Sequence, residues 1–239
     1  MAKKLLICLL CVAMLLSMTA CGAPSDVRGD ITPNPTTEAA VVPTEATTEA
    51  TTEATTEPSE EREFNIGSAT GNTYKNAFIG IQCTLDANWT FKTDEEMRAI
   101  NEASIGAVGD DYKAMLASAS VIQDMFATHA DQMSTVNVVL EKIGIANLLM
   151  TEEQYLAVAK DPAVEALSSM GLNITSAEVV SMDFAGKEHA ALIVEADIGG
   201  IAMYEYIVVV KCSGYIACIT ACTWLENGCV DILNQFEPC

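Results

Sequence analysis

The strongest hydrophobic pattern in the chain runs from Ala202 to Thr223, as two apolar segments separated by Ser213-Gly214. Two-residue turns that contain glycine are typical of β-hairpins, and pairing across this turn places Cys212 opposite Tyr215. Apolar side chains fall on both faces of the predicted hairpin, so neither face can meet water along its length. The pattern therefore predicts a central strand pair that other elements cover on both sides.

The segment before this hairpin predicts a mixture of strands and helices. Residues 74–85 alternate as two short strands with a bend at Gly80. Thr93 and Glu96 form a capping box, which predicts a helix after Thr93. Residues 118–128 fit either a helix or a strand. We choose the strand, because residues 134–142 then complete a second hairpin.

The C-terminal half predicts a strand meander between two helices. A second capping box, Thr151 to Gln154, begins a helix that Asp161-Pro162 should break or restart and Gly171 should end. Strands are expected over 177–184 and 189–196, before the central hairpin. A last helix is expected over 226–236, with Val230, Leu233 and Phe236 toward the sheet and Pro238 at its end.

The N-terminus has the pattern of an export signal. Lys3-Lys4 precede an apolar run too short to span a bilayer, and small residues then lead to Cys21. This resembles a bacterial lipoprotein lipobox, although Met18 replaces the usual leucine. The resemblance implies that Cys21 is diacylated on sulfur and becomes the mature N-terminus. The alternative is an ordinary secretory signal with an unrelated cysteine.

Residues 22–71 are rich in Thr, Glu and Pro and cannot bury a core, so we expect a solvated stalk. Such a chain would span about 35–42 Å as a flexible coil. Arg28-Gly29-Asp30 spells an integrin-recognition tripeptide, but three residues recur easily by chance in such a segment. The expected organisation is a signal peptide over 1–20, a lipid-anchored disordered stalk over 21–71 and one domain over 72–239.

Charge argues against a nucleic-acid partner. The whole chain carries 33 acidic and 12 basic residues, and the expected domain carries 23 acidic and 8 basic residues. Binding to a phosphate backbone needs a basic surface, and these lysines and arginines are isolated. We therefore expect the membrane, other envelope proteins or cell-wall components as partners, and an extracytoplasmic location at the cell membrane.

The order of the expected elements resembles the PsbP-like fold of extrinsic photosystem subunits, which also occurs in bacterial lipoproteins. The resemblance rests on the bent aromatic strand that leads through a turn to Trp89, and on the helix, hairpin, helix and meander that follow. The usual proline of this turn is replaced by Asp86-Ala-Asn88. The resemblance implies an α+β fold, with an antiparallel sheet flanked by helices on both faces in an α/β/α sandwich, and a non-enzymatic docking role.

Few residues are candidates for chemistry. His129 and His189 lie near a predicted turn and a predicted strand start, and we interpret both as solvated or capped. The acidic runs at 94–96 and 110–111 lack the spacing of a Ca²⁺ loop. Tyr74 and Trp89 are candidate ligand-pocket or core aromatics. We expect no catalytic residue, metal site or cofactor.

Six cysteines remain outside the signal segment and Cys21: Cys83, Cys212, Cys218, Cys222, Cys229 and Cys239. This even number of cysteines is compatible with disulfides and equally with free thiols packed in a core. Cys222 with Cys229 is the candidate disulfide, across the loop that follows the central hairpin. Cys218 and Cys222 cannot pair, because four residues of one strand separate them by about 13 Å.

Two classes of function fit this chain. The first is a membrane-anchored lipoprotein whose domain is a binding or accessory module at the cell surface. The second is an unrecognised hydrolytic or ligand-carrier activity in a cleft of the domain. A concave pocket with convergent polar groups would favour the second.

Overall fold

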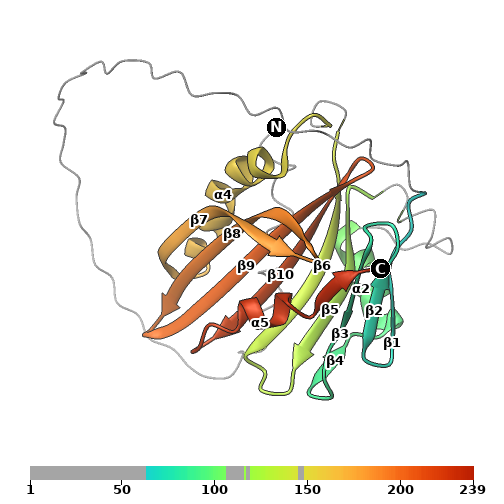
Figure 1. Cartoon of the computed structure of the whole chain (residues 1–239). Coiled ribbons are helices and arrows are strands. Elements are labelled where there is room, and N and C mark those ends of the chain that lie inside the picture. The colour runs from blue at the N-terminus through green and yellow to red at the C-terminus, as the bar shows by residue number, and fades with distance from the viewer. Residues whose placement is uncertain (1–62, 106–115, 117–118, 145–147) are drawn as a thin grey trace, which may run out of the picture.

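The computed structural model describes residues 63–105, 116, 119–144 and 148–239, which form two antiparallel sheets and three helices (Figure 1). The large sheet has the order β4 (Trp89–Phe91), β5 (Val121–His129), β6 (Ser134–Lys142), β10 (Tyr215–Trp224), β9 (Ile201–Cys212), β8 (Lys187–Ile198) and β7 (Asn173–Phe184). The small sheet has the order β1 (Ser68–Thr70), β2 (Thr73–Asn76), β3 (Ile81–Thr84) and β11 (Phe236–Pro238). The helices are α2 (Asp94–Ile105), α4 (Glu152–Ser169) and α5 (Cys229–Leu233).

The predicted central hairpin is confirmed as β9 and β10. Cys212 pairs with Tyr215 in the predicted register, and Ser213 and Gly214 adopt φ values of 37° and 83°. Positive φ at both central residues matches the backbone twist that a two-residue hairpin needs. The predicted hairpin of β5 and β6 and the meander from β7 to β10 are confirmed as well.

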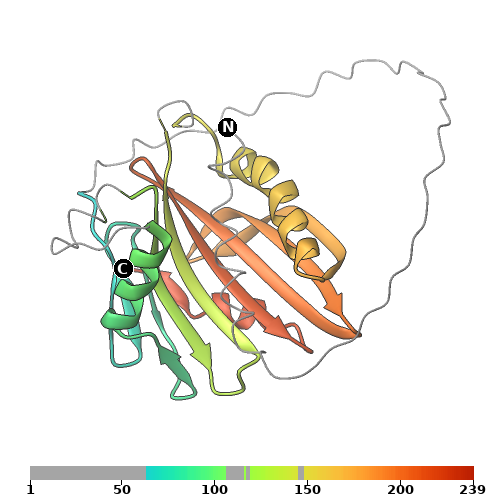
Figure 2. The ribbon, with the colours of Figure 1, turned by 180° about the vertical axis from the view of Figure 1, so that it is seen from behind.

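The expected layers need a correction. One face of the large sheet packs on α4, as predicted, through Tyr155, Leu156 and Leu167. The opposite face is covered mainly by the small sheet, through residues such as Ile81, with only the five-residue α5 beside it. Figures 1 and 2 show α4 and α5 on opposite sides of the large sheet. The fold is therefore largely antiparallel β, rather than a sheet between two helical layers.

Both predicted capping boxes are present, at Thr93 with Glu96 and at Thr151 with Gln154. However, α4 continues through Pro162, where we expected a break. The buried side chains of α4 recur every four residues on both sides of the proline, at positions such as Ala159 and Ala163. This continuous stripe against the sheet offsets the backbone hydrogen bond that proline cannot make.

The predicted last helix over 226–236 is wrong for most of its length. Only Cys229–Leu233 is helical, and Phe236 pairs with Cys83 as part of β11. Val230, expected on the covered face, is 46% exposed. Pairing with β3 satisfies the backbone of the last residues, and this partner lies far away in sequence.

The folded region begins earlier than residue 72. Phe64 stacks on Tyr215 with ring centroids 4.8 Å apart, and β1 pairs with β2. The packing of Phe64 on the core and the pairing of β1 with β2 join this part of the expected stalk to the domain. Cys21, Arg28-Gly29-Asp30 and Asp110-Asp111 lie outside the described residues.

Candidate functional site

The ladder between β8 and β9 stops before the strands do. Its last pair toward the β9–β10 turn is Ala191 with Val208, although β8 begins at Lys187 and β9 continues to Cys212. These strand ends therefore separate. Their backbone groups need other partners, because an unpaired buried N–H is costly.

The carboxylate of Glu152 lies in this opening. It accepts hydrogen bonds from the backbone N–H of Ala190 on β8 at 3.2 Å and of Lys211 on β9 at 2.9 Å. Glu152 is the first residue of α4, and the capping box at Thr151 fixes its position. The helix start thus bridges the two strands, and its own unpaired N–H groups favour a carboxylate there.

His189 completes this arrangement. Its Nδ1 lies 3.1 Å from both oxygens of Glu152, and its side chain is 12% exposed. A carboxylate at Nδ1 holds the imidazole in one orientation. Among the residues that the structure describes, no Ser, Thr or Cys is hydrogen-bonded to His189, so its geometry is that of a structural contact and not of a nucleophile pair.

An open cleft of about 590 Å³ adjoins this contact, and we call it the β7 cleft. It is lined by the first turn of α4 together with β7 and β8, including Val179, Val180 and Glu188. The hydroxyl of Ser181 donates a hydrogen bond to the carboxylate of Glu188. Glu152, Glu153 and Glu188 make the lining acidic.

β7 forms one end of the large sheet and pairs only with β8 within the described part of the chain. It is twelve residues long and has one irregularity, between Ile174 and Ser176. From Ser176 to Phe184 it carries no proline or lysine, which are common devices for blocking an exposed edge. Its outer backbone groups are therefore available along a regular stretch.

A second cavity, of about 600 Å³, lies between α2, β1 and β5, and we call it the α2 cavity. Asp124 forms part of its wall at the bulge of β5, and accepts hydrogen bonds from Tyr74 Oη, from Asn76 Nδ2 at 2.7 Å and from Gly67 N at 2.8 Å. Burial raises the pKa of Asp124, and these three donors counteract the rise. Asn101 bonds both backbone groups of Gln123. Asp124 and Asn101, in the wall of this cavity, are thus engaged within the protein.

Gly67 is required by this geometry. A Cβ atom at Gly67 would lie 2.5 Å from the Tyr74 ring and 2.8 Å from Asp124 Oδ2. The backbone can approach the buried carboxylate only because no side chain intervenes.

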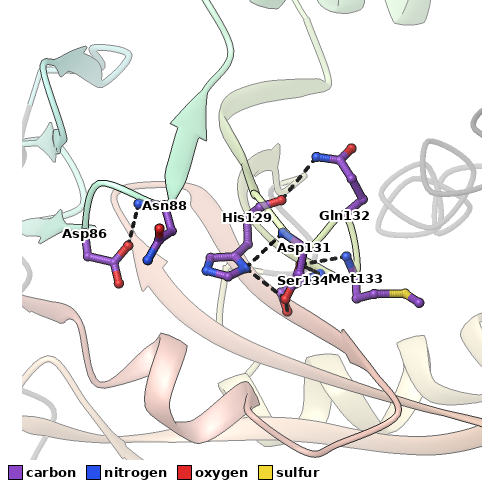
Figure 3. A network of polar contacts seen from close by, with 7 residues as sticks. All are labelled: Asp86, Asn88, His129, Asp131, Gln132, Met133 and Ser134. Atoms are coloured by element: carbon purple, nitrogen blue, oxygen red, sulfur yellow. Dashed lines mark hydrogen bonds and ion pairs between the residues drawn. The ribbon is translucent and has the colours of Figure 1, made fainter.

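Figure 3 shows a polar network at the turn between β5 and β6. His129 Nδ1 lies 2.8 Å from Asp131 Oδ2, and Asp131 also accepts from the backbone N–H of Met133 at 2.7 Å. The Trp89 ring packs on His129 with centroids 5.2 Å apart. This network orders the turn. His129 lies next to the turn, which is the position that the sequence predicted.

The predicted candidate aromatics do not meet at one site. Tyr74 is fully buried in the core, and Trp89 is half-buried against His129. Neither lines the β7 cleft or the α2 cavity. The structure thus places Tyr74 in a core role.

Cys222 and Cys229 are both free thiols, and they lie in the two different cores on opposite sides of the large sheet. Burial raises the pKa of Cys229 to about 11, and burial also raises the pKa of Cys222 well above its usual value. Thiol exchange requires the thiolate, so both are slow to react. Their pairing stays a prediction for peptide mapping.

Glu205 is a buried acid that the sequence reasoning overlooked. Its side chain is 1% exposed, and burial raises its pKa to about 7. It faces Cys222 across the β9–β10 ladder, on the side of the sheet that packs on α4. A single acid inside an otherwise apolar strand pattern was the signal that could have identified it.

The described residues contain no group of three or more His, Cys, Asp or Glu side chains arranged to hold a metal ion. Among the described helices, none combines the length and the apolar character needed to cross a membrane. Asp94 and Glu95, a predicted acidic run, lie in the first turn of α2, and Glu96 serves its capping box.

No family model matches the chain, and no curated protein matches it. Solved structures that are similar to this chain include the following two. Cyanobacterial PsbP (CyanoP) from Synechocystis is 14% identical, covers 72% of this chain and 98% of its own, and gives a TM-score of 0.40. LpqN, described as involved in cell envelope biogenesis of Mycobacterium tuberculosis, is 10% identical, covers 66% and 82%, and gives 0.35. Both TM-scores are below 0.5. The function proposed below is therefore inferred from the residues of this chain alone.

Proposed function

We propose that this protein is a lipoprotein tethered to the extracytoplasmic face of the cell membrane, and that its domain is a non-enzymatic binding or accessory module. The single observation that carries the binding role is the open edge of β7 beside the acidic β7 cleft. An exposed strand edge recognises another chain through its backbone. The polar groups of the nearby Glu152 and His189 already bond to one another, which supports recognition over reaction.

Attachment is proposed through Cys21 at the end of the acidic stalk. Each buried CH₂ of an acyl chain contributes about 0.8 kcal/mol, and two chains give stable anchoring where one gives marginal binding. The acidic stalk and domain cannot attract anionic lipids, so the acyl chains must hold the protein alone.

Fractionation of cells tests this attachment. We expect the wild-type protein in the membrane fraction, released by detergent and not by salt, and Cys21→Ala should block processing and change the mass. Protease applied to wall-stripped cells should cut within residues 36–57 and release an intact domain. Wild-type protein that is soluble in the medium with an unmodified Cys21 would contradict the proposal.

A carrier activity is the second candidate, and the α2 cavity is the observation that favours it. Its volume of about 600 Å³ lies within the range of small-ligand pockets, about 300–1,000 Å³, and Phe91, Met97 and Ile122 give it an apolar lining. Mass spectrometry of the protein purified under native conditions tests it. A co-purifying small molecule that Met97→Trp displaces would support the carrier role.

A further inference from the structure

We infer that the edge of β7 from Ser176 to Phe184 binds an extended, positively charged segment of a partner protein, which adds a strand to the large sheet. This inference rests on the proposed binding function and names the kind of partner. It is carried by three independent features: the open backbone of the edge, the acidic groups beside it, and the apolar contacts on its two faces.

The backbone supplies the first feature. The irregularity between Ile174 and Ser176 confines any disruption to the start of β7. The nine residues that follow are in continuous register with β8. A strand of about five to ten residues is the usual length in sheets, so this stretch can pair with a complete added strand.

Charge supplies the second feature and selects the partner. Glu178 and Asp183 are exposed on β7, and the exposed Glu153 and Glu188 line the adjoining cleft. Two exposed bases lie close to these acids: Lys187 at the start of β8, and Lys211 on β9, whose ammonium group already donates to the backbone carbonyls of Leu148 and Met150. Lysine or arginine side chains of an added strand would therefore meet opposite charges, which favours encounter and register.

The same charges disfavour a second copy of this chain as the occupant. A second β7 strand would add its own Glu178 and Asp183 to an edge that already carries these acids, and residues 176–184 contain no basic residue to pair with them. Like charges on paired strands are destabilising. Acids on an edge therefore prevent self-association while leaving the edge open to a cationic segment.

Apolar contacts on both faces supply the third feature. Val179 packs on the α4 side of the sheet, and Val180 and Met182 pack on the opposite side. All three are partly exposed. Successive apolar residues of an added strand can extend both cores, since successive side chains of a strand point to opposite faces.

A peptide titration tests the inference with the full-length lipidated protein in detergent. The test peptide has roughly nine residues, repeats two lysines followed by two valines so that each face presents both residue types, and is capped at both ends. One comparison peptide carries glutamate in place of lysine, and another carries N-methyl groups on alternate amides, which block pairing. We expect binding of the first peptide only, weakened by salt, with slowed amide hydrogen exchange within residues 176–184.

Charge-reversal variants sharpen the test. Glu178→Lys and Asp183→Lys should each weaken binding roughly threefold to tenfold, because each removes an attraction and adds a repulsion. Asp231→Lys is the matched control, because Asp231 is an exposed acid on α5. It should leave binding unchanged.

Several results would overturn the inference: equal binding of the lysine and glutamate peptides, no binding of either, protection of residues outside β7, or a β7-mediated dimer in sedimentation. In each case, partners that crosslink to another surface of the protein in intact cells would leave the proposed function standing. Absence of any crosslinked partner would refute the proposed function itself.

Discussion

β4 and β7 form the two ends of the same sheet, but β4 has three residues and β7 has twelve. The short edge offers little backbone for pairing and is held to its inner neighbour β5. Trp89 packs on His129, and the backbone N–H of Lys92 bonds Phe126 just beyond β4. The long edge has no described strand or turn paired along it.

The elements beside the two edges differ in the same way. Beside β4, buried hydrogen bonds of Asp124 and Asn101 connect β5 to the small sheet and to α2. Beside β7, the acids line an open cleft. The comparison indicates that one end of the sheet is built for stability and the other for contact. Substitutions of the hydrogen-bonded Asp124 and Asn101 near β4 should therefore destabilise the protein, and exposed substitutions on β7 should change binding alone.

The largest effect on the stability of the protein is expected from substitution of Asp124. Asp124→Ala leaves the donors of Tyr74, Asn76 and Gly67 buried without an acceptor. We expect a loss of about 3–5 kcal/mol in the free energy of unfolding, measured by urea denaturation. Asp231→Ala, at an exposed acid, is the control. A loss below about 1 kcal/mol would mean that the β4 end does not depend on this network.

The next effect concerns the middle of the sheet and depends on pH. Burial raises the pKa of Glu205 to about 7, against about 4.3 in an unfolded chain. The native state thus binds the proton more tightly, and stability is lost as pH rises from about 4.3 to 7. Glu205→Gln removes this loss. We expect the variant's stability relative to wild type to increase by about 3 kcal/mol between pH 4 and pH 8.

Thermal melts of both proteins across this pH range measure the difference. The wild type should melt at lower temperature as pH rises through 7, relative to the variant. Parallel melting curves of the two proteins over the whole range would show that Glu205 titrates normally in the folded state.

A smaller effect is expected where α4 bridges β8 and β9. Glu152→Ala leaves the N–H groups of Ala190 and Lys211 without their acceptor. We expect a loss of about 1–3 kcal/mol, together with faster hydrogen exchange at these two amides. Glu153→Ala is the matched control, because Glu153 is the exposed neighbour on the same helix turn. Unchanged exchange at both amides would refute the bridging role.

The smallest effect is expected at the β9–β10 turn. Gly214 has a φ of 83°, so Gly214→Val strains the backbone by about 1 kcal/mol or more. Gly144→Val is the control, because a Cβ at Gly144 meets nothing within 4 Å and its φ lies outside the left-handed region. Equal melting temperatures of the two variants would contradict the assigned turn strain.

The sequence predicts those elements whose signals are local. The turn at Ser213-Gly214 and the two capping boxes each lie within four residues, and the structure has all three. The meander follows from strand patterns and turns of the same kind. Local propensity is sufficient there because neighbouring strands pair with each other.

The parts that the sequence did not predict depend on distant partners. Phe236 is in a strand because it pairs with Cys83, and Pro162 is tolerated because α4 packs on the sheet along its length. The sequence identifies Glu152 only as an acid at the start of a helix. Its second role, as hydrogen-bond acceptor for backbone N–H groups of β8 and β9, exists because these two strands separate. The open edge of β7 likewise cannot be read from residues 173–184, since edge position is a property of the whole sheet.

Site-specific photocrosslinking in intact cells tests the central claim most directly. A photoreactive residue replaces Glu178 on β7 or, for comparison, the exposed Thr90 on β4 in the full-length lipidated protein. The account predicts a discrete crosslinked partner from position 178, with a lower yield when Asp183→Lys is added, and none from position 90. Equal crosslinking from both positions, or crosslinking from position 90 alone, would contradict it.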